Sequence, residues 1–217
     1  MYRIVFLLII ASLFGSCHEQ QPEAIRLPYY NRADFTPLFL SNSQDIEKHV
    51  PHTIADFEFL NQDSALINQH TIENKIHVAN FIFTRCGSIC PAMTDNLKLV
   101  SDSLGNDSAL VFLSYSVTPW IDKPHILKKF KEKHQIRNKN WHFITGNKGD
   151  IYKLARQSYF AEEDLGFSKD STNFLHTEHF ILVDPSKRIR GVYNGTLQLE
   201  MEQLADDIRT LQQEIKR

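Results

Sequence analysis

Two cysteines at the start of a predicted helix are the residues best suited to chemistry in this sequence. Cys86 and Cys90 follow an apolar run at residues 76–84, and Pro91 comes directly after the second thiol. Thiols four residues apart at a helix start lie on one side of the chain, close enough to share a metal ion or to close a disulfide. The positive end of the helix dipole favours thiolate there. Metal binding, thiol–disulfide exchange and a structural disulfide all stay open at this point.

An alternation of strands and helices must position these cysteines. Apolar runs rich in β-branched and aromatic residues have the length of buried strands, and apolar residues between them recur at helical spacing. A hairpin and a final helix complete the pattern. The apolar stripe of this helix resembles a short heptad seam, but it is under three heptads long, so we expect the helix to pack on the domain's own sheet. The order implies a mostly parallel sheet that helices cover on both faces. The expected strands are 76–84, 109–117, 141–145, 179–184 and 189–193, and the expected helices begin near Cys90 and at 123 and 150, with the last carrying the stripe from Leu197 to Ile215.

Length and composition limit the possible classes of protein. The 217 residues correspond to one domain with extensions, and 42% hydrophobic with 23% charged residues is ordinary globular composition. The 24 basic and 26 acidic residues leave a formal charge of −2, so no positive excess is available to neutralise a phosphate backbone. We therefore expect no nucleic-acid partner. Three cysteines are too few for a disulfide-dense scaffold.

The N-terminus has the layout of an export signal. A basic start, about ten apolar residues and small residues occur in positions 1–16, and this apolar run is shorter than the roughly 20 residues of a membrane span. Small residues directly before Cys17 resemble a bacterial lipoprotein signal, in which the cysteine is acylated; a plain signal peptide or an uncleaved anchor is the alternative. We expect a signal peptide at 1–16, a lipid-anchored tether and lead-in segment at 17–54 and one domain at 55–217, exported and facing the periplasm.

Four ordered motifs resemble the Sco/SenC family of exported, membrane-anchored, thioredoxin-like proteins, over the chain from about Ile54 to the C-terminus. Thr118 and Leu175 replace the aspartates of the family pattern, and no acidic residue lies between the two thiols. The motifs are the Cys-x-x-x-Cys-Pro turn at 86–91, the Ser-Val-Thr-Pro to Asp-Lys-Pro stretch at 116–124, the Trp-His-Phe-Ile-Thr-Gly strand end at 141–146, and His176-Thr177 nine residues before Pro185.

This resemblance implies a thioredoxin-like α/β fold with a central mixed sheet, flanking helices and an edge hairpin. It also implies one copper ion per chain, held by Cys86, Cys90 and His176, and two thiolates with one imidazole form a soft site that suits copper. Family members deliver copper to, or keep reduced, the cysteines of the dinuclear copper centre of cytochrome c oxidase. The implied partners are the copper-centre subunit of that oxidase, thiol reductants, and the membrane through the N-terminal lipid.

Two other functions stay open. A thiol–disulfide oxidoreductase would use Cys86 and Cys90 as a redox pair, whereas a metallochaperone is not an enzyme in the strict sense. A zinc module would need a fourth ligand beyond the three obvious ones. His179 is offset by three residues from the family's ligand position, so we expect a strand-end residue there. The other eight histidines show no ligand spacing and are expected to be solvated.

Overall fold

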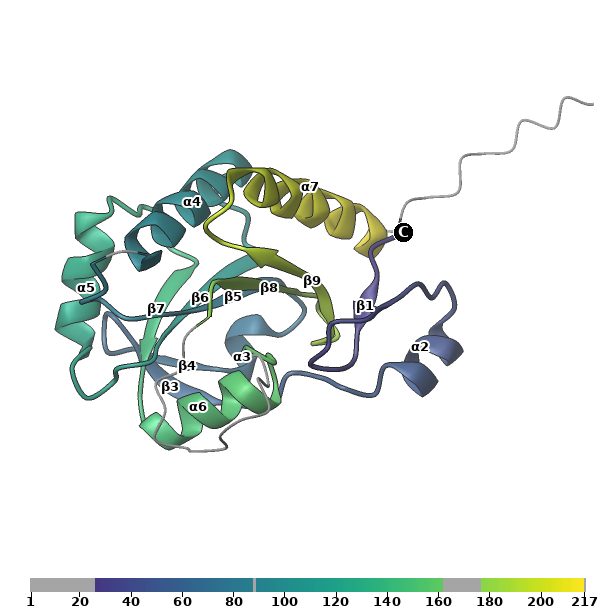
Figure 1. The fold of residues 1–217 in the computed structure, drawn as a ribbon, viewed down its shortest axis with the longest axis horizontal. Coiled ribbons are helices and arrows are strands. Elements are labelled where there is room, and N and C mark those ends of the chain that lie inside the picture. The colour runs from purple at the N-terminus through teal and green to yellow at the C-terminus, as the bar shows by residue number, and fades with distance from the viewer. Residues whose placement is uncertain (1–25, 88, 162–176, 217) are drawn as a thin grey trace, which may run out of the picture.

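The computed structural model describes residues 26–87, 89–161 and 177–216 (Figure 1). Its strands and helices alternate, and the predicted mixed α/β class is confirmed. The strands are β1 (Tyr29–Tyr30), β2 (Pro37–Leu38), β3 (Glu58–Asn61), β4 (Leu66–Asn68), β5 (Ile76–Ile82), β6 (Leu110–Ser116), β7 (Trp141–Thr145), β8 (His179–Val183) and β9 (Ile189–Asn194). The helices are α2 (Ser43–His49), α3 (Gln69–Ile72), α4 (Ile89–Leu104), α5 (Pro124–Lys133), α6 (Lys148–Gln157) and α7 (Gln198–Ile215).

The described strands form one mixed sheet in the order β2-β1-β9-β8-β5-β6-β7-β3-β4. Its centre is parallel, because α4 and α5 return the chain from β5 to β6 and from β6 to β7. The other described pairings are antiparallel, so the sheet is mixed rather than mostly parallel. The predicted β8–β9 hairpin is present, and β1 extends the sheet beyond it through the pairing of Tyr30 with Ile189. The opposite edge of the sheet, next to β7, is formed by the β3–β4 hairpin, which the sequence did not predict.

Two apolar cores lie on opposite faces of the sheet. Successive side chains of β5 point to opposite faces of the sheet. Val78 and Ile82 pack in one core with side chains of α4, α5 and α7. Ala79 and Phe81 pack in the other core with side chains of α3 and α6. Figure 1 shows α4 and α7 on one side of the strands and α3 and α6 on the other. Strands buried on both faces are apolar throughout, which is why the sequence predicts β5 and β6 well.

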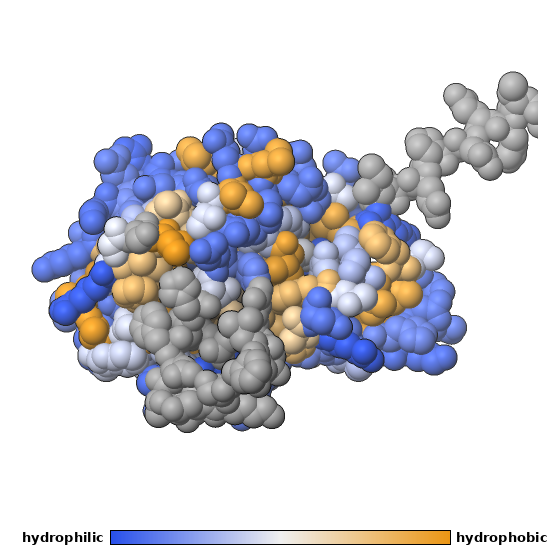
Figure 2. Space-filling model, in the orientation of Figure 1, coloured by the Kyte–Doolittle hydropathy of each residue, from blue (hydrophilic) through white to orange (hydrophobic). Residues whose placement is uncertain are grey.

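The stripe of α7 packs on the domain itself. Met201, Leu204, Ile208 and Leu211 are buried, and α7 contacts α4 and β9. The expectation that this helix covers its own sheet is confirmed. Figure 2 shows hydrophilic residues over much of the outer surface of α4, α5 and α7, with apolar residues in small patches between them. In the part of the chain that the structure describes, no helix is both long and apolar enough to cross a membrane.

The lead-in segment after residue 25 is fastened to the domain by Arg190. This guanidinium is 3% exposed, and it donates from Nη2 to the Leu27 carbonyl oxygen at 2.7 Å and from Nε to the Pro28 carbonyl oxygen at 3.0 Å. It also forms ion pairs with Asp184 at 3.4 Å and with Glu214, near the end of α7, at 2.8 Å. The segment is thereby held across β9 and the last turn of α7.

His77 contradicts the expectation that the unassigned histidines are solvated. It lies on β5, fully buried, with Nε2 3.1 Å from the hydroxyl of Tyr159, which is 3.3 Å from the hydroxyl of Tyr115. Burial disfavours the charged imidazolium and lowers the pKa of His77 to about 3. Burial also lowers the pKa of the half-buried His142, to about 4. The apolar run that predicts β5 contains His77, and its alternation points this side chain into a core.

We expect His77 to make the fold sensitive to acid. The unfolded chain takes up a proton at His77 below about pH 6.5, whereas the folded protein does so only near pH 3. The free energy of unfolding therefore falls as the pH drops between these values, by up to about 1.4 kcal/mol per pH unit. Urea unfolding at pH 7 and pH 4.5 should show a fall about 1–2 kcal/mol smaller in His77→Leu than in the wild type. The exposed His125→Leu should keep the wild-type slope, and an equal slope in His77→Leu would contradict the assignment.

Candidate metal centre

Cys86 and Cys90 come together where β5 passes into α4. The chain turns after Ile82, with the Cys86 amide donating to the Phe83 carbonyl oxygen at 3.2 Å. The amide of Cys90 points at the Sγ atom of Cys86 at 3.4 Å. Neither residue is in a disulfide; Cys86 is half-buried and Cys90 is buried. The predicted arrangement of two thiols on one side of a helix start is therefore present.

Burial affects the pKa of the Cys90 thiol more than the helix N-terminus does. Desolvation is the main cause that raises the pKa of Cys90 to about 12, and the neighbouring Cys86 thiol raises it further. A backbone hydrogen bond from Phe83 opposes this shift only in part. The expectation that the helix N-terminus favours thiolate is therefore wrong for Cys90. In the metal-free protein Cys90 carries its proton at neutral pH, and a bound metal must displace it.

Asp122 holds the turn that carries Cys86, a role that the sequence reasoning missed. Its carboxylate is fully buried and accepts hydrogen bonds from the Thr84 amide at 3.2 Å and the Thr84 hydroxyl at 2.6 Å. The hydroxyls of Ser116 and Thr118 donate to it at 2.6 and 2.8 Å. Thr118, where the family pattern has Asp, is thus one of its donors. The sequence does carry a signal for this role, because Asp122 lies in the 116–124 motif, but the motif alone does not show which of its residues supports the turn.

The third expected ligand, His176, and the expected lipid site, Cys17, lie outside the described residues. The next histidine, His179, opens β8, and its ring packs edge-on against Phe35 with the centroids 6.0 Å apart. Glu178 accepts a hydrogen bond from the side chain of Asn194 at 3.1 Å. The position of His179 at the start of β8 agrees with the expectation of a strand-end residue.

The donor set fits a soft metal ion. Two thiols from one turn provide soft ligands, which select copper(I) or zinc over calcium or magnesium. Within the ranges that the structure describes, no group of three or more His, Cys, Asp or Glu side chains is arranged to hold a metal ion. His176, the third ligand expected from the sequence, is not among those residues.

A family model described as SCO1/SenC matches residues 46–213 of this chain. The chain belongs to the SCO1/SenC family. The SCO1 protein homolog of Bacillus subtilis (strain 168) is 29% identical over 178 residues, covering 81% of this chain and 91% of that protein. A SCO1/SenC family lipoprotein from Bacillus anthracis str. Ames has a solved structure with a TM-score of 0.64 and 28% identity, covering 74% of this chain and 95% of the other.

Two further solved structures of Sco proteins resemble this chain. BsSco, described as a member of the Sco family of cytochrome c oxidase assembly proteins with a disulfide switch, gives a TM-score of 0.63 at 28% identity, over 74% of this chain and 93% of its own. Bradyrhizobium japonicum ScoI, solved with copper bound, gives a TM-score of 0.58 at 20% identity, over 73% of this chain and 99% of its own. At that identity the likeness to ScoI establishes the shared fold. The thioredoxin-like fold expected for this SCO1/SenC chain is confirmed.

Proposed function

We propose that this protein binds one copper ion through Cys86, Cys90 and His176. It delivers this ion to the dinuclear copper site of a respiratory cytochrome c oxidase, or keeps the cysteines of that site reduced. Membership of SCO1/SenC supports the assignment, because Sco family proteins take part in cytochrome c oxidase copper assembly. Copper bound to ScoI supports the choice of metal within the family.

The pair of reduced cysteines at the start of α4 is the main support for copper binding. The Cys90 amide lies 3.4 Å from Cys86 Sγ, so the two side chains belong to one compact turn, and both are available as ligands. Because thiolates bind the metal, loading releases the proton that burial keeps on Cys90. The same requirement makes thiol reductants partners of this protein, since an oxidised pair has no thiolate to offer.

Strand polarity supports His176 as the third ligand. β8 runs antiparallel to β5, with Ala79 opposite Ile181, so the start of β8 and the end of β5 lie at the same end of the sheet. β5 leads to Cys86, and His176 precedes β8 by a short stretch of chain. A site of three protein ligands also leaves a coordination position for a donor from the recipient, which allows the ion to be handed over.

Copper titration of the mature chain tests this assignment. Copper(I), competed against a chromogenic chelator, should saturate the wild type at about one ion per chain. Cys86→Ser and Cys90→Ser should lose stoichiometric binding, because one thiolate cannot hold the ion alone. His176→Ala should bind at least tenfold more weakly, and His179→Ala should match the wild type.

The same variants separate the copper site from a thiol–disulfide oxidoreductase. That activity requires both cysteines and no histidine ligand. If His176→Ala kept wild-type copper affinity and wild-type exchange with a thiol pool, while either cysteine change abolished exchange, the oxidoreductase would replace the metallochaperone. Competition with zinc during the titration would identify a zinc module by a preference for zinc over copper(I).

The N-terminus supports a membrane location for this activity. We propose that residues 1–16 are an export signal and that Cys17 carries the lipid, with the domain facing the periplasm. The small residues before Cys17 and the lipoprotein relative from Bacillus anthracis support this anchoring. An anchored domain is held near a membrane-bound oxidase, which raises the frequency of encounter between the two proteins.

A further inference from the structure

A basic surface with an exposed aromatic residue flanks the Cys86 turn. It comprises Arg85, Trp120, Lys123 and Lys148, and we call it the Trp120 surface. The Trp120 side chain is 50% exposed, although large aromatic residues are usually buried. Lys148 Nζ lies 5.1 Å from the centroid of the Trp120 ring and 5.1 Å from that of Tyr152. The half-buried Lys148 therefore makes cation–π contacts with both rings, which restrain the indole of Trp120.

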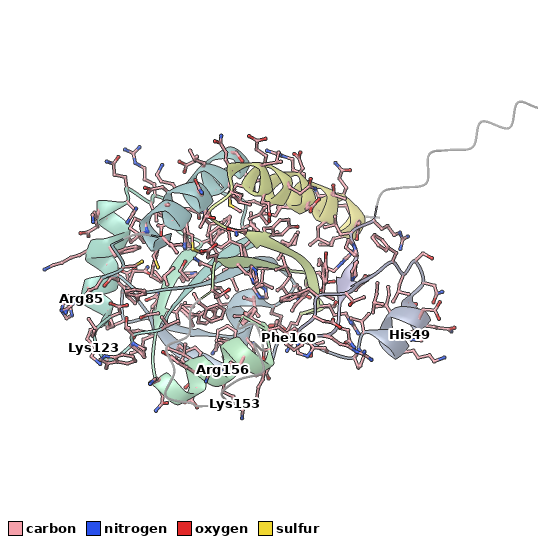
Figure 3. The ribbon with its side chains drawn as sticks, viewed as in Figure 1. His49, Arg85, Lys123, Lys153, Arg156 and Phe160 are labelled. Carbon is pink, nitrogen blue, oxygen red and sulfur yellow. The ribbon has the colours of Figure 1, made fainter. Side chains whose placement is uncertain are left out.

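Hydrogen bonds join this surface to the proposed copper site. The Asp122 carboxylate binds the amide and hydroxyl of Thr84, so the loop that carries Trp120 and the turn that carries Arg85 and Cys86 are fastened together. Lys123 Nζ donates to the Pro119 carbonyl oxygen at 3.0 Å, which braces the same loop. Figure 3 shows Arg85 and Lys123 at one end of the molecule, opposite the end where α2 carries His49.

The positive charge of the Trp120 surface is not compensated within the described structure. Lys98, Lys128, Lys187, Arg190 and Arg209 each form an ion pair with a described carboxylate, whereas Arg85, Lys123 and Lys148 form none with the residues that the structure describes. The Asp122 carboxylate is fully buried and accepts hydrogen bonds from Thr84, Ser116 and Thr118, and it forms no ion pair with a described cation. The whole chain has a formal charge of −2, so these three cations beside the Cys86 turn do not reflect a basic composition.

We propose that the Trp120 surface docks the copper-accepting protein, and that its occupant is an acidic rim around the acceptor's own metal site. This inference rests on the proposed copper transfer, which requires the acceptor to approach Cys86. The exposed indole and Arg85 are residue types that dominate binding energy at interfaces. The three cations attract carboxylates over a distance, which speeds association and orients it. Nucleic acid does not fit as the occupant, because the chain as a whole is acidic.

Association with the metal-free acceptor tests the docking surface. The probe is the soluble copper-centre domain of the oxidase subunit from the same genome, with binding followed by surface plasmon resonance at 20 mM and 500 mM NaCl. Trp120→Ala should weaken binding about tenfold at both salt concentrations. Lys148→Glu should slow association about tenfold at low salt and much less at high salt, because salt screens the lost attraction.

Two matched variants at the opposite end of the molecule provide the control. Phe39 is 75% exposed, and Lys48 is an exposed lysine on α2 without an ion pair to any described residue. Phe39→Ala and Lys48→Glu should stay within twofold of the wild type. The inference is overturned if the domain does not bind the wild type, if both pairs of variants weaken binding equally, or if vesicles of anionic lipid bind this surface and the domain does not.

The readouts keep this inference separate from the proposed function. Docking is measured without copper, so it does not depend on loading. Trp120→Ala and Lys148→Glu should still titrate with about one copper per chain. Loss of copper binding in the wild type would reject the proposed function, whereas normal loading with unchanged docking in these variants would reject the Trp120 surface alone.

Discussion

Replacing Arg190 by Met is expected to lower the free energy of unfolding by about 3–5 kcal/mol. The change removes the cation that forms ion pairs with two largely buried carboxylates, Asp184 and Glu214. It also leaves the carbonyl oxygens of Leu27 and Pro28 without their donors and removes the guanidinium 4.0 Å from the Tyr29 ring. Methionine keeps the apolar stem, so lost packing contributes little. Urea unfolding followed by circular dichroism measures the effect.

The expected loss is a large part of the 5–15 kcal/mol typical of a domain, so we expect Arg190→Met to accumulate poorly as folded protein. Glu214→Gln is the milder companion, because it keeps two polar atoms near Arg190 and removes one charge; it should cost about 1–2 kcal/mol. Arg209→Met is the matched control. Its exposed pair with Asp206 should contribute less than about 0.5 kcal/mol. Equal effects of Arg190→Met and Arg209→Met would contradict the assigned role.

Replacing Asp122 by Ala is expected to have the second large effect, about 3–5 kcal/mol of stability. Four donors would lose a buried acceptor, among them the Thr84 amide, which has no freedom to turn elsewhere. Asp122→Asn should cost about 2 kcal/mol, because one oxygen remains as an acceptor. Urea unfolding of the metal-free protein measures both values.

Asp122 should also affect the reactivity of the adjacent cysteine. Asp122→Asn removes one of the two acceptors that hold Thr84, which leaves the turn that carries Cys86 less restrained, so iodoacetamide should alkylate Cys86 several-fold faster in this variant than in the wild type. Asp102→Asn, in an exposed pair with Lys98, should change neither stability nor alkylation. A destabilised Asp122→Asn with an unchanged alkylation rate would show that Asp122 supports the loop after β6 but not the Cys86 turn.

Features encoded by neighbouring residues were predicted from the sequence. β5 and β6 are apolar on both faces, and α4 shows its periodicity through Met93 and Leu97. α6 begins two residues earlier than expected, because the Asn147 side chain caps the helix by accepting from the amides of Gly149 and Asp150. Asn147 is therefore an N-cap signal in the sequence that would have placed the start of α6 correctly.

Features that depend on distant contacts were not predicted. β3 and β4 are short and leave Leu60 and Leu66 exposed, so their pattern is weak; β3 is fixed by its antiparallel pairing with β7, where Leu60 faces Thr145. The same limit applies to the site. The spacing of Cys86 and Cys90 was enough to predict that they lie close together. The burial that raises the pKa of Cys90 depends on the folded core and could not be predicted from this spacing.

Arg190 and Glu214 hold Leu27 against the domain, and this contact limits the distance between the proposed copper site and the membrane. The described chain begins beside the C-terminal end of α7, and Arg85 lies at the other end of the longest axis (Figures 1 and 3). With a lipid on Cys17, the intervening nine or so residues form a leash of at most about 30 Å, at roughly 3.3–3.6 Å per residue. The membrane attachment and the cysteine pair then lie at opposite ends of the domain. Such a geometry favours acceptors that stand well above the membrane surface.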